Sequence, residues 1–213
     1  MLKKLKLSKI QNIQKNFFIP DYWEEKYIAG ATKWDNGQPA STLISLLESN
    51  SLQPGKIAVL GCGYGHDTLL FSEYGFDAIG FDFAPSAIAH AQSLAKESGL
   101  PVQFLLRNIF QLSSEFSGYF DYIWENGCFC SISPTKRSEY VKTVYSLLKP
   151  NGYFLGLFLV FADENSLPFG IEATQIVSLF SNSFKQPIKF ELTQDIPKCE
   201  KGKKLLAMFK TKK

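Results

Sequence analysis

The sequence lacks a long hydrophobic run. Its longest apolar stretch, Tyr153 to Phe161, has the length of a β-strand, whereas a membrane-spanning helix needs about 20 apolar residues. Its basic start carries neither the continuous apolar stretch of about 7–15 residues nor the small-residue cleavage site of a secretory signal. These absences argue against membrane-spanning and exported proteins, and we expect a cytoplasmic chain with no membrane partner.

Cysteine and histidine are scarce: the 213 residues include four cysteines and two histidines. In a chain that is not exported, the cysteines are expected to be free thiols. Cys128 and Cys130 are separated by one residue, which is not the paired spacing of structural zinc sites, and only His66 and His90 could complete a ligand set. We therefore predict no metal site.

The sequence also lacks a strong net charge. The formal charge is +3, and the basic clusters lie near the two ends, within residues 3–9 and 201–213. A nucleic-acid-binding domain usually carries a basic face mixed with aromatic residues through its body. Solvated ends explain these lysines more simply, so we expect a small-molecule partner and no nucleic acid.

The sequence does contain a regular alternation of short apolar runs and helical patterns. Apolar residues make up 45% and charged residues 20%, the balance of a globular protein. The length favours one domain, and no repeat divides it. We expect strands at residues 57–60, 77–81, 102–106, 120–125, 153–160, 188–192 and 205–210, with helices at 67–74, 85–98, 135–148 and 172–180.

Apolar strands separated by helices are typical of a parallel sheet that is covered on both faces. Right-handed crossovers then give a doubly wound α/β fold. The last two strands lie close enough to pair as an antiparallel hairpin at the sheet edge. We predict a single domain over residues 1–213 with a mostly parallel, seven-stranded sheet.

A glycine-rich turn follows the first strand and reads Gly-Cys-Gly-Tyr-Gly-His-Asp over residues 61–67. Glycines there let backbone N–H groups approach a ligand, and a following helix N-terminus favours an anionic group. Asp82 ends the next strand about twenty residues later, where an acid can accept both hydroxyl hydrogens of a ribose. Together these features favour an adenosine-type cofactor over a purely structural turn.

The turn departs from the dinucleotide fingerprint, because His66 stands where the third glycine would be. A pyrophosphate would lose that glycine, whereas the amino-acid end of S-adenosylmethionine needs less room. The antiparallel edge hairpin is also typical of methyltransferases. Asp67, at the start of the helix, is interpreted equally well as a helix cap or as a ligand contact.

Residues 1–39 precede the first strand of the sheet and hold two of the three tryptophans, Trp23 and Trp34, with Tyr27 nearby. So much aromatic surface must be buried against something. An open sheet binds its ligand beyond the carboxyl ends of the strands, so we predict that this segment is a helical lid over the cofactor. The alternative is that the aromatics are ordinary core residues.

Several blocks of the sequence carry a resemblance to a family. The sequence from about Tyr22 to the C-terminus resembles the thiopurine S-methyltransferase-like family of class I S-adenosylmethionine-dependent methyltransferases, which have a Rossmann-like fold. Its Trp-Asp-x-Gly-x-Pro block at residues 34–39 is most similar to the branch of thiol and halide methyltransferases. The matching blocks are Trp23, residues 34–39, 59–67, 80–82, Phe120-Asp121 with Phe129-Cys130, and residues 148–152.

The resemblance implies which residues contact the cofactor. The aromatic residues would cover it, the turn would face its methionine part, and Asp82 would hold its ribose. Asn108 and Ile109 would frame the adenine, and the end of the fourth strand would lie beside the sulfonium. The predicted cofactor residues are Trp23, Tyr27, Trp34, Gly61, Gly63, Asp82, Asn108, Ile109, Glu125 and Asn126.

Methyl transfer from a sulfonium is an in-line displacement, in which the protein aligns the reactants and excludes water. A thiol, a halide or a related soft nucleophile needs no strong general base, and the sequence shows no catalytic triad. Asp35 is our candidate catalytic residue, either orienting the acceptor or locking the lid. Cys128 and Cys130 are interpreted as residues lining the acceptor pocket rather than as nucleophiles.

Two departures from the family leave the acceptor undefined. Residues 165–170 replace a Gly-Gly-Pro-Pro-aromatic stretch, and residues 198–200 stand where an arginine is usual. A non-catalytic S-adenosylmethionine-binding sensor or interaction protein is the alternative function, although intact turn glycines speak against it. A nicotinamide-dependent oxidoreductase conflicts with His66. We expect a monomer or a weak homodimer.

Overall fold

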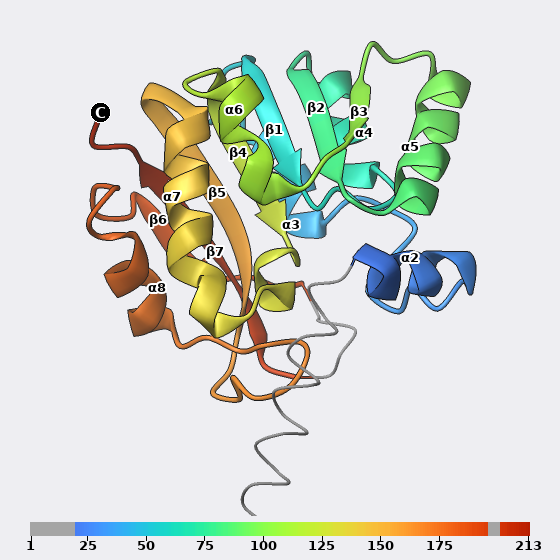
Figure 1. Ribbon diagram of the computed structural model, residues 1–213. Helices are drawn as coiled ribbons and strands as arrows, with labels where there is room; N and C mark the ends of the chain where they lie inside the picture. Colours follow the sequence, from blue (N-terminus) through green and yellow to red (C-terminus); the bar gives the residue numbers. More distant parts are fainter. Residues whose placement is uncertain (1–19, 196–200) are drawn as a thin grey trace, which may run out of the picture.

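The computed structural model describes residues 20–195 and 201–213 and shows a seven-stranded sheet with helices on both faces (Figure 1). The strand order is β3-β2-β1-β4-β5-β7-β6. The first five in this order are parallel, β7 is antiparallel to β5, and β6 is antiparallel to β7. The strands are β1 (Lys56–Leu60), β2 (Asp77–Asp82), β3 (Gln103–Leu106), β4 (Phe120–Asn126), β5 (Leu148–Val160), β6 (Lys189–Leu192) and β7 (Lys203–Lys210).

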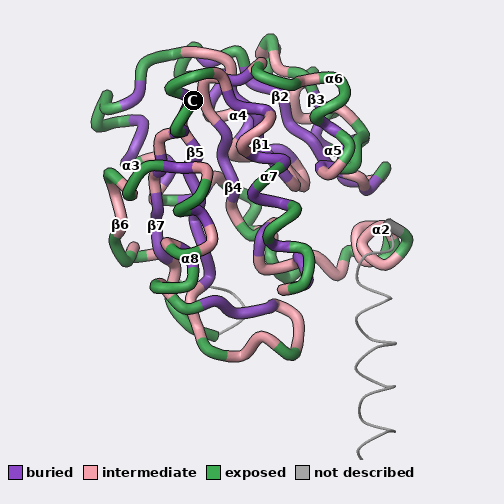
Figure 2. Tube along the Cα trace, turned by 60° about the vertical axis from the view of Figure 1, so that its left-hand side comes forward, coloured by how far each residue is buried: buried purple, intermediate pink, exposed green. Residues whose placement is uncertain are grey.

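Two large hydrophobic cores lie on the two faces of the sheet, and a smaller third cluster joins α5 to β3. The core on one face contains residues of α7 and α8, and the core on the other contains residues of α3 and α4. Figure 2 shows that the buried residues concentrate in the strands and on the inner sides of these helices, while α2 stands apart from the sheet. The helices are α2 (Pro20–Ile28), α3 (Ser41–Glu48), α4 (His66–Glu73), α5 (Pro85–Ser98), α6 (Ser113–Phe116), α7 (Arg137–Leu147) and α8 (Ala173–Phe180).

Local sequence explains the limits of the elements. In β1, Ile57 and Val59 face the α3–α4 core and Ala58 and Leu60 face the other, so this central strand is apolar throughout. The helix α5 begins with Pro85 in its first turn and ends at Gly99, whose φ of 68° is the left-handed conformation that glycine adopts readily.

The structure confirms all seven predicted strands and the antiparallel hairpin at one end of the sheet. It also corrects details. The helix predicted at residues 135–148 begins as a 3-10 turn, Pro134–Lys136, and continues as α7, while β5 starts at Leu148 rather than residue 153. The helix α3 was not predicted. Residues 1–19 of the proposed lid lie outside the described residues.

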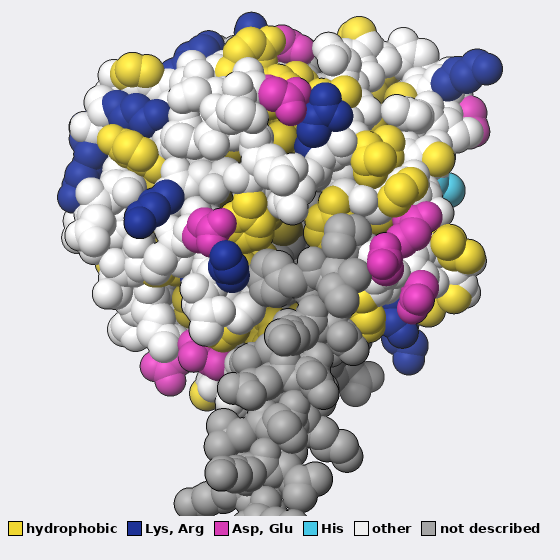
Figure 3. All heavy atoms as spheres, viewed as in Figure 1, with side chains coloured by type: hydrophobic (Ala, Val, Ile, Leu, Met, Phe, Trp, Pro, Cys, Tyr) yellow, Lys and Arg dark blue, Asp and Glu magenta, His cyan; other side chains and the backbone are white. Residues whose placement is uncertain are grey.

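On the face of the molecule shown in Figure 3, acidic and basic side chains are interspersed with uncharged and apolar ones. Within residues 20–195 and 201–213, no helix is long and apolar enough to cross a membrane. The same residues contain no group of three or more His, Cys, Asp or Glu side chains placed to hold a metal ion.

Candidate active site

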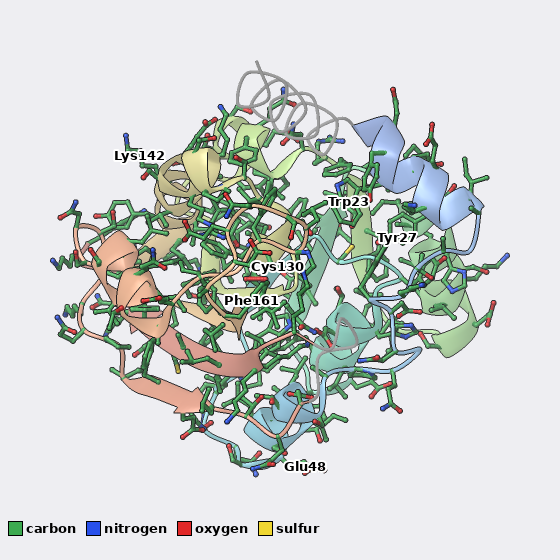
Figure 4. All side chains as sticks on the ribbon, turned by 90° about the horizontal axis from the view of Figure 1, so that it is seen from below. Trp23, Tyr27, Glu48, Cys130, Lys142 and Phe161 are labelled. Carbon is green, nitrogen blue, oxygen red and sulfur yellow. The ribbon has the colours of Figure 1, made fainter. Side chains whose placement is uncertain are left out.

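A cavity of about 490 Å³ opens at the carboxyl ends of the parallel strands. Its volume lies within the range of about 300–1,000 Å³ that is typical of small-molecule sites. The turn after β1 and the end of β2 line one side, and α2 with the segment after it lines another. Figure 4, viewed toward this end of the sheet, shows Trp23 and Tyr27 on α2 and Cys130 nearer the centre of the molecule.

The glycine turn leaves its backbone open toward the cavity. Gly61 and Gly63 have φ values of 61° and 53°, in the left-handed region that side-chain-bearing residues rarely adopt. A Cβ on Gly61 would lie 2.8 Å from the Cβ of Cys128, and one on Gly63 would lie 3.1 Å from the Tyr27 hydroxyl. The turn therefore forms a cradle that any side chain would narrow.

Asp82 connects the end of β2 to the glycine turn. Its two carboxylate oxygens accept hydrogen bonds from the amides of Gly63 and Ala84, each at 3.0 Å. Burial raises the pKa of Asp82, and the two amides partly oppose this rise. The carboxylate lines the cavity and has unused lone pairs, so this acid and the open turn fit an adenosine-type cofactor with an amino-acid end.

The aromatic residues of the N-terminal segment form one cluster over the cavity. The ring of Trp34 lies 5.2 Å from that of Trp23 and 5.6 Å from that of Tyr27, both edge to face. All three line the cavity, and Trp34 is 43% exposed. None of the three belongs to a buried core of the described residues, which favours their interpretation as cover for the cofactor over that as ordinary core aromatics.

A hydrogen-bonded contact fixes α2 against α5. The carboxylate of Glu24 accepts from the Ser86 amide at 3.0 Å and from the Ser86 hydroxyl at 2.5 Å. Ser86 lies in the first turn of α5, where a carboxylate satisfies a free helical N–H and the helix dipole adds attraction. The cluster over the cavity is therefore attached to the sheet domain through α5.

Asp67 is not the helix cap, and it lines the cavity. The N-cap of α4 is Gly65, which corrects the cap interpretation. One Asp67 oxygen accepts from the Ala40 amide at 2.9 Å, and the other accepts from Trp124 Nε1 at 2.7 Å and Asn126 Nδ2 at 3.0 Å. Asp67 thus joins the end of the N-terminal segment to the end of β4.

Asp35 lies in the segment after α2 and faces the start of α4. Its Oδ1 is 3.4 Å from His66 Nε2 and accepts from the Gly37 amide at 3.2 Å. Asp35 also lines the cavity. These contacts link the N-terminal segment to the glycine turn, which agrees with the lid-locking half of the Asp35 hypothesis.

The structure brings three more predicted residues to the cavity and places one elsewhere. Asn108, Ile109 and Asn126 line it, and the Asn108 side chain accepts from the Phe110 amide at 3.0 Å. Glu125 is fully buried and is not among the lining residues; its Oε1 accepts from the Phe129 amide at 3.1 Å. Its predicted contact with the cofactor finds no support in this placement.

Burial raises the pKa of Glu125 to about 7, although the Phe129 amide and the charge of Lys204 act in the opposite direction. The pKa of Glu125 is higher in the folded chain than the value of 4.5 in the unfolded chain. The stability that the neutral carboxyl group contributes is therefore fully present below pH 4.5 and is lost as the pH rises through about 7. Glu125→Gln keeps an oxygen for the Phe129 amide. We expect it to raise the free energy of unfolding more at pH 8 than at pH 5, by about 2–3 kcal/mol.

Urea denaturation at the two pH values measures this difference. The control is Glu73→Gln, because Glu73 is exposed near the end of α4; it should show almost no dependence on pH. Equal effects of Glu125→Gln at pH 5 and pH 8 would contradict the assignment.

Three cysteines of the described residues line the cavity as free thiols: Cys62, Cys128 and Cys130. Burial raises the pKa of both Cys62 and Cys128, which keeps them protonated and weakly nucleophilic. The Cys130 thiol donates to the Gly127 carbonyl at 3.0 Å. These contacts favour pocket-lining roles over covalent catalysis.

Three further residues organise the cavity or the elements around it. The Arg137 guanidinium donates to the carbonyls of Phe169 and Gly170 at 3.2 and 2.8 Å, which holds a loop whose residues Leu167 and Pro168 line the cavity. Asp195 accepts from the amides of Ser41 and Thr42, each at 3.1 Å, at the start of α3. Lys204 lines the cavity from β7. No local sequence pattern indicates these roles, because each depends on partners that are distant in the chain.

Comparison with known proteins indicates the family of this chain. The model of the thiopurine S-methyltransferase family matches residues 19–212. Thiocyanate methyltransferase 1 of Brassica oleracea is 30% identical over 146 residues, which cover 68% of this chain and 65% of that protein. Probable thiol methyltransferase 2 of Arabidopsis thaliana is 31% identical over 175 residues, 73% of this chain and 75% of that protein.

A solved structure shows the same fold. The Burkholderia thailandensis 1,6-didemethyltoxoflavin-N1-methyltransferase, with bound 1,6-didemethyltoxoflavin and S-adenosylhomocysteine, has a TM-score of 0.74 at 19% identity, covering 91% of this chain and 87% of its own. Because the family match extends over nearly the whole chain and includes the glycine turn and Asp82, the chain belongs to the thiopurine S-methyltransferase family of S-adenosylmethionine-dependent methyltransferases.

Proposed function

We propose that this methyltransferase acts on a small soft nucleophile: a thiol, thiocyanate or a halide. The observation that carries the proposal is that one cavity extends from Asp82 on β2 to an apolar compartment lined by Leu157 and Leu159 of β5. Two relatives are named for thiocyanate and thiol methylation. An apolar compartment suits acceptors that lose little hydration free energy when they leave water.

We also propose the roles of the residues around the cofactor. Bound S-adenosylmethionine supplies a methyl group that its sulfonium charge has already activated. The Asp82 carboxylate accepts the ribose hydroxyls, the backbone at Gly61 and Gly63 holds the amino-acid end, and Asn108 with Ile109 frames the adenine. Asn126, which is fixed by Asp67, lies at the border between the cofactor and acceptor parts of the cavity.

The N-terminal segment has the role of a lid in this proposal. Trp23, Tyr27 and Trp34 cover the cavity, and Asp35 locks the segment to His66. The lid excludes water and aligns the reactants. Alignment and water exclusion account for the transfer without a general base, because a thiolate or halide needs no deprotonation in the transfer step.

Binding and transfer assays test this function separately. S-adenosylmethionine should raise the melting temperature, while NAD should not, because only a ligand that binds the native state stabilises it. Labelled S-adenosylmethionine should then transfer its methyl group to at least one acceptor among thiols, thiocyanate, halides, thiopurines and tellurite. Binding without any transfer would favour the non-catalytic sensor, and stabilisation by NAD alone would favour an oxidoreductase.

Asp82→Ala should lower the affinity for S-adenosylmethionine at least about tenfold, because it removes hydrogen bonds to a charged acceptor worth about 1.5–3 kcal/mol each. It also removes the acceptor that the Gly63 amide uses. Calorimetry measures the affinity. Asp77→Ala, at the exposed opposite end of the same strand, is the matched control and should bind normally. Equal affinities of the two variants would remove Asp82 from the site.

A further inference from the structure

The far end of the cavity is apolar but carries a lysine. Leu157, Leu159, Leu167 and Pro168 line it, together with Lys204. Lys204 pairs directly with Leu159 across the β5–β7 ladder. In the strand order, β7 lies on the opposite side of β1 from β2, which carries Asp82. The lysine is therefore at the acceptor end of the cavity, away from the proposed ribose site.

The ammonium group of Lys204 is held in place but is not neutralised by contact with a carboxylate. Its Nζ donates to Asn126 Oδ1 at 2.8 Å. Among the described residues, no carboxylate oxygen lies within 4.0 Å of it. Glu125 and Asp195 feel its charge, but both carboxylates already accept backbone hydrogen bonds. Within residues 20–195 and 201–213, no second hydrogen-bond partner of this Nζ is seen, so two of its N–H donors can bind a ligand in the cavity.

A cation at this place has an electrostatic consequence. Asn126 lies next to the proposed position of the positively charged sulfonium, so a lysine bonded to Asn126 repels a bound cofactor. An anion that lies between the two positive charges is attracted to both of them, which offsets this repulsion. The apolar walls strengthen both, because water does not screen them.

We propose that Lys204 selects an anionic methyl acceptor. The inference rests on the methyl transfer proposed above and adds the charge of the acceptor and the residue that recognises it. A second lining lysine, Lys33, is exposed on the segment that covers the cofactor, so it lies outside the apolar compartment. Lys204 and the leucines of β5 together favour a soft anion, such as thiocyanate, iodide or a thiolate.

The charge balance of the transfer predicts how Lys204 acts. A lone pair of the acceptor forms the bond to the methyl carbon, and the bond from that carbon to the donor sulfur breaks with its electron pair left on sulfur. An anionic acceptor becomes a neutral product, and no proton moves. Lys204 thus attracts the acceptor more strongly before transfer than during it. Loss of its charge should raise the KM for the acceptor while kcat stays constant or rises.

The test compares thiocyanate with thiourea, a neutral molecule of similar size that also presents a soft sulfur atom. Calorimetry measures the affinity of both probes for the protein with and without saturating S-adenosylhomocysteine. Lys204→Met should weaken thiocyanate binding at least tenfold and leave thiourea binding and S-adenosylhomocysteine binding unchanged. Lys204→Arg should restore thiocyanate binding. Lys203→Met changes the adjacent exposed lysine and should match the wild type.

Three results would overturn the inference: equal thiocyanate affinity of Lys204→Met and the wild type, equal losses for thiocyanate and thiourea, or equal loss in Lys203→Met. The first result would mean that Lys204 does not contact the acceptor. The second would mean that Lys204 only shapes the cavity. The third would mean that long-range charge alone affects anion binding. Failure of the proposed function differs from all three, because it appears as no S-adenosylmethionine binding or no labelled transfer by the wild type. Anion affinity is measured without turnover.

Discussion

Replacing Gly63 by valine is expected to lower the affinity for S-adenosylmethionine by at least about a hundredfold, or roughly 2.7 kcal/mol. The Cβ alone would lie 3.1 Å from the Tyr27 hydroxyl, and the two methyl groups of valine extend further into the cradle. Valine also resists the φ of 53° at this position. The turn must therefore shift, and the Gly63 amide would no longer point at Asp82. Calorimetric titration measures the loss.

Gly99→Val separates backbone strain from the loss of the cradle. Gly99 has a φ of 68°, and a Cβ there would meet no atom within 4 Å. Both variants should lose stability, on the order of 1–2 kcal/mol from the left-handed backbone alone, but only Gly63→Val should lose cofactor binding. If Gly63→Val binds as tightly as Gly99→Val, the turn is structural and holds no ligand.

Asp67→Asn is expected to destabilise the fold by about 1–3 kcal/mol, although it changes the volume of the side chain very little. All three partners of the carboxylate are donors: the Ala40 amide, Trp124 Nε1 and Asn126 Nδ2. An amide group has one oxygen, so its NH₂ must face at least one of these donors. The asparagine loses fewest hydrogen bonds if its oxygen faces Trp124 and Asn126 and its NH₂ faces the Ala40 amide. Ala40 is buried, and an unsatisfied N–H there costs about 1–3 kcal/mol.

The same change should loosen the lid. The Ala40 amide connects the N-terminal segment to Asp67, so we expect trypsin to cleave after the exposed Lys33 even when S-adenosylmethionine is present, while the cofactor slows this cleavage in the wild type. Urea denaturation measures the stability. Glu73→Gln, which also converts a carboxylate to an amide on α4 but at an exposed position, should change neither property. If Asp67→Asn keeps the stability of the wild type and the same protection from trypsin, Asp67 does not hold the N-terminal segment in place.

Much of the fold could be predicted from the sequence because its signals are local. The apolar run at residues 57–60, the glycines of the turn and Pro85 with Gly99 each restrict the backbone through their own chemistry. The spacing from the turn to Asp82 placed that acid at the cavity, because the ends of adjacent parallel strands meet at one edge. The aromatic segment was expected there because so much exposed aromatic surface is unfavourable in water.

The helix α3 was not predicted because its sequence is short, and its first turn is capped from far away. Asp195 accepts from the amides of Ser41 and Thr42, whereas Ala40, the N-cap residue, makes no side-chain cap. A helix of eight residues has little stability of its own. The helix forms because Leu43 and Leu47 are buried against the sheet. The sequence near α3 shows neither these packing partners nor the residue that caps its first turn.

Local signals in the sequence were enough to predict the seven strands, the helices α4, α5, α7 and α8, the open glycine turn and the family to which the chain belongs. Which side chain of each strand reaches the cavity depends on how the chain packs in three dimensions. Asn126 lines it, while the adjacent Glu125 is buried on the other face of the sheet; Lys204 lines it, while Lys203 is exposed. Successive residues of a strand point to opposite faces, so the face that meets a cavity depends on what packs against each side. That packing joins residues 40, 67 and 126 through one carboxylate, a contact that no local pattern encodes.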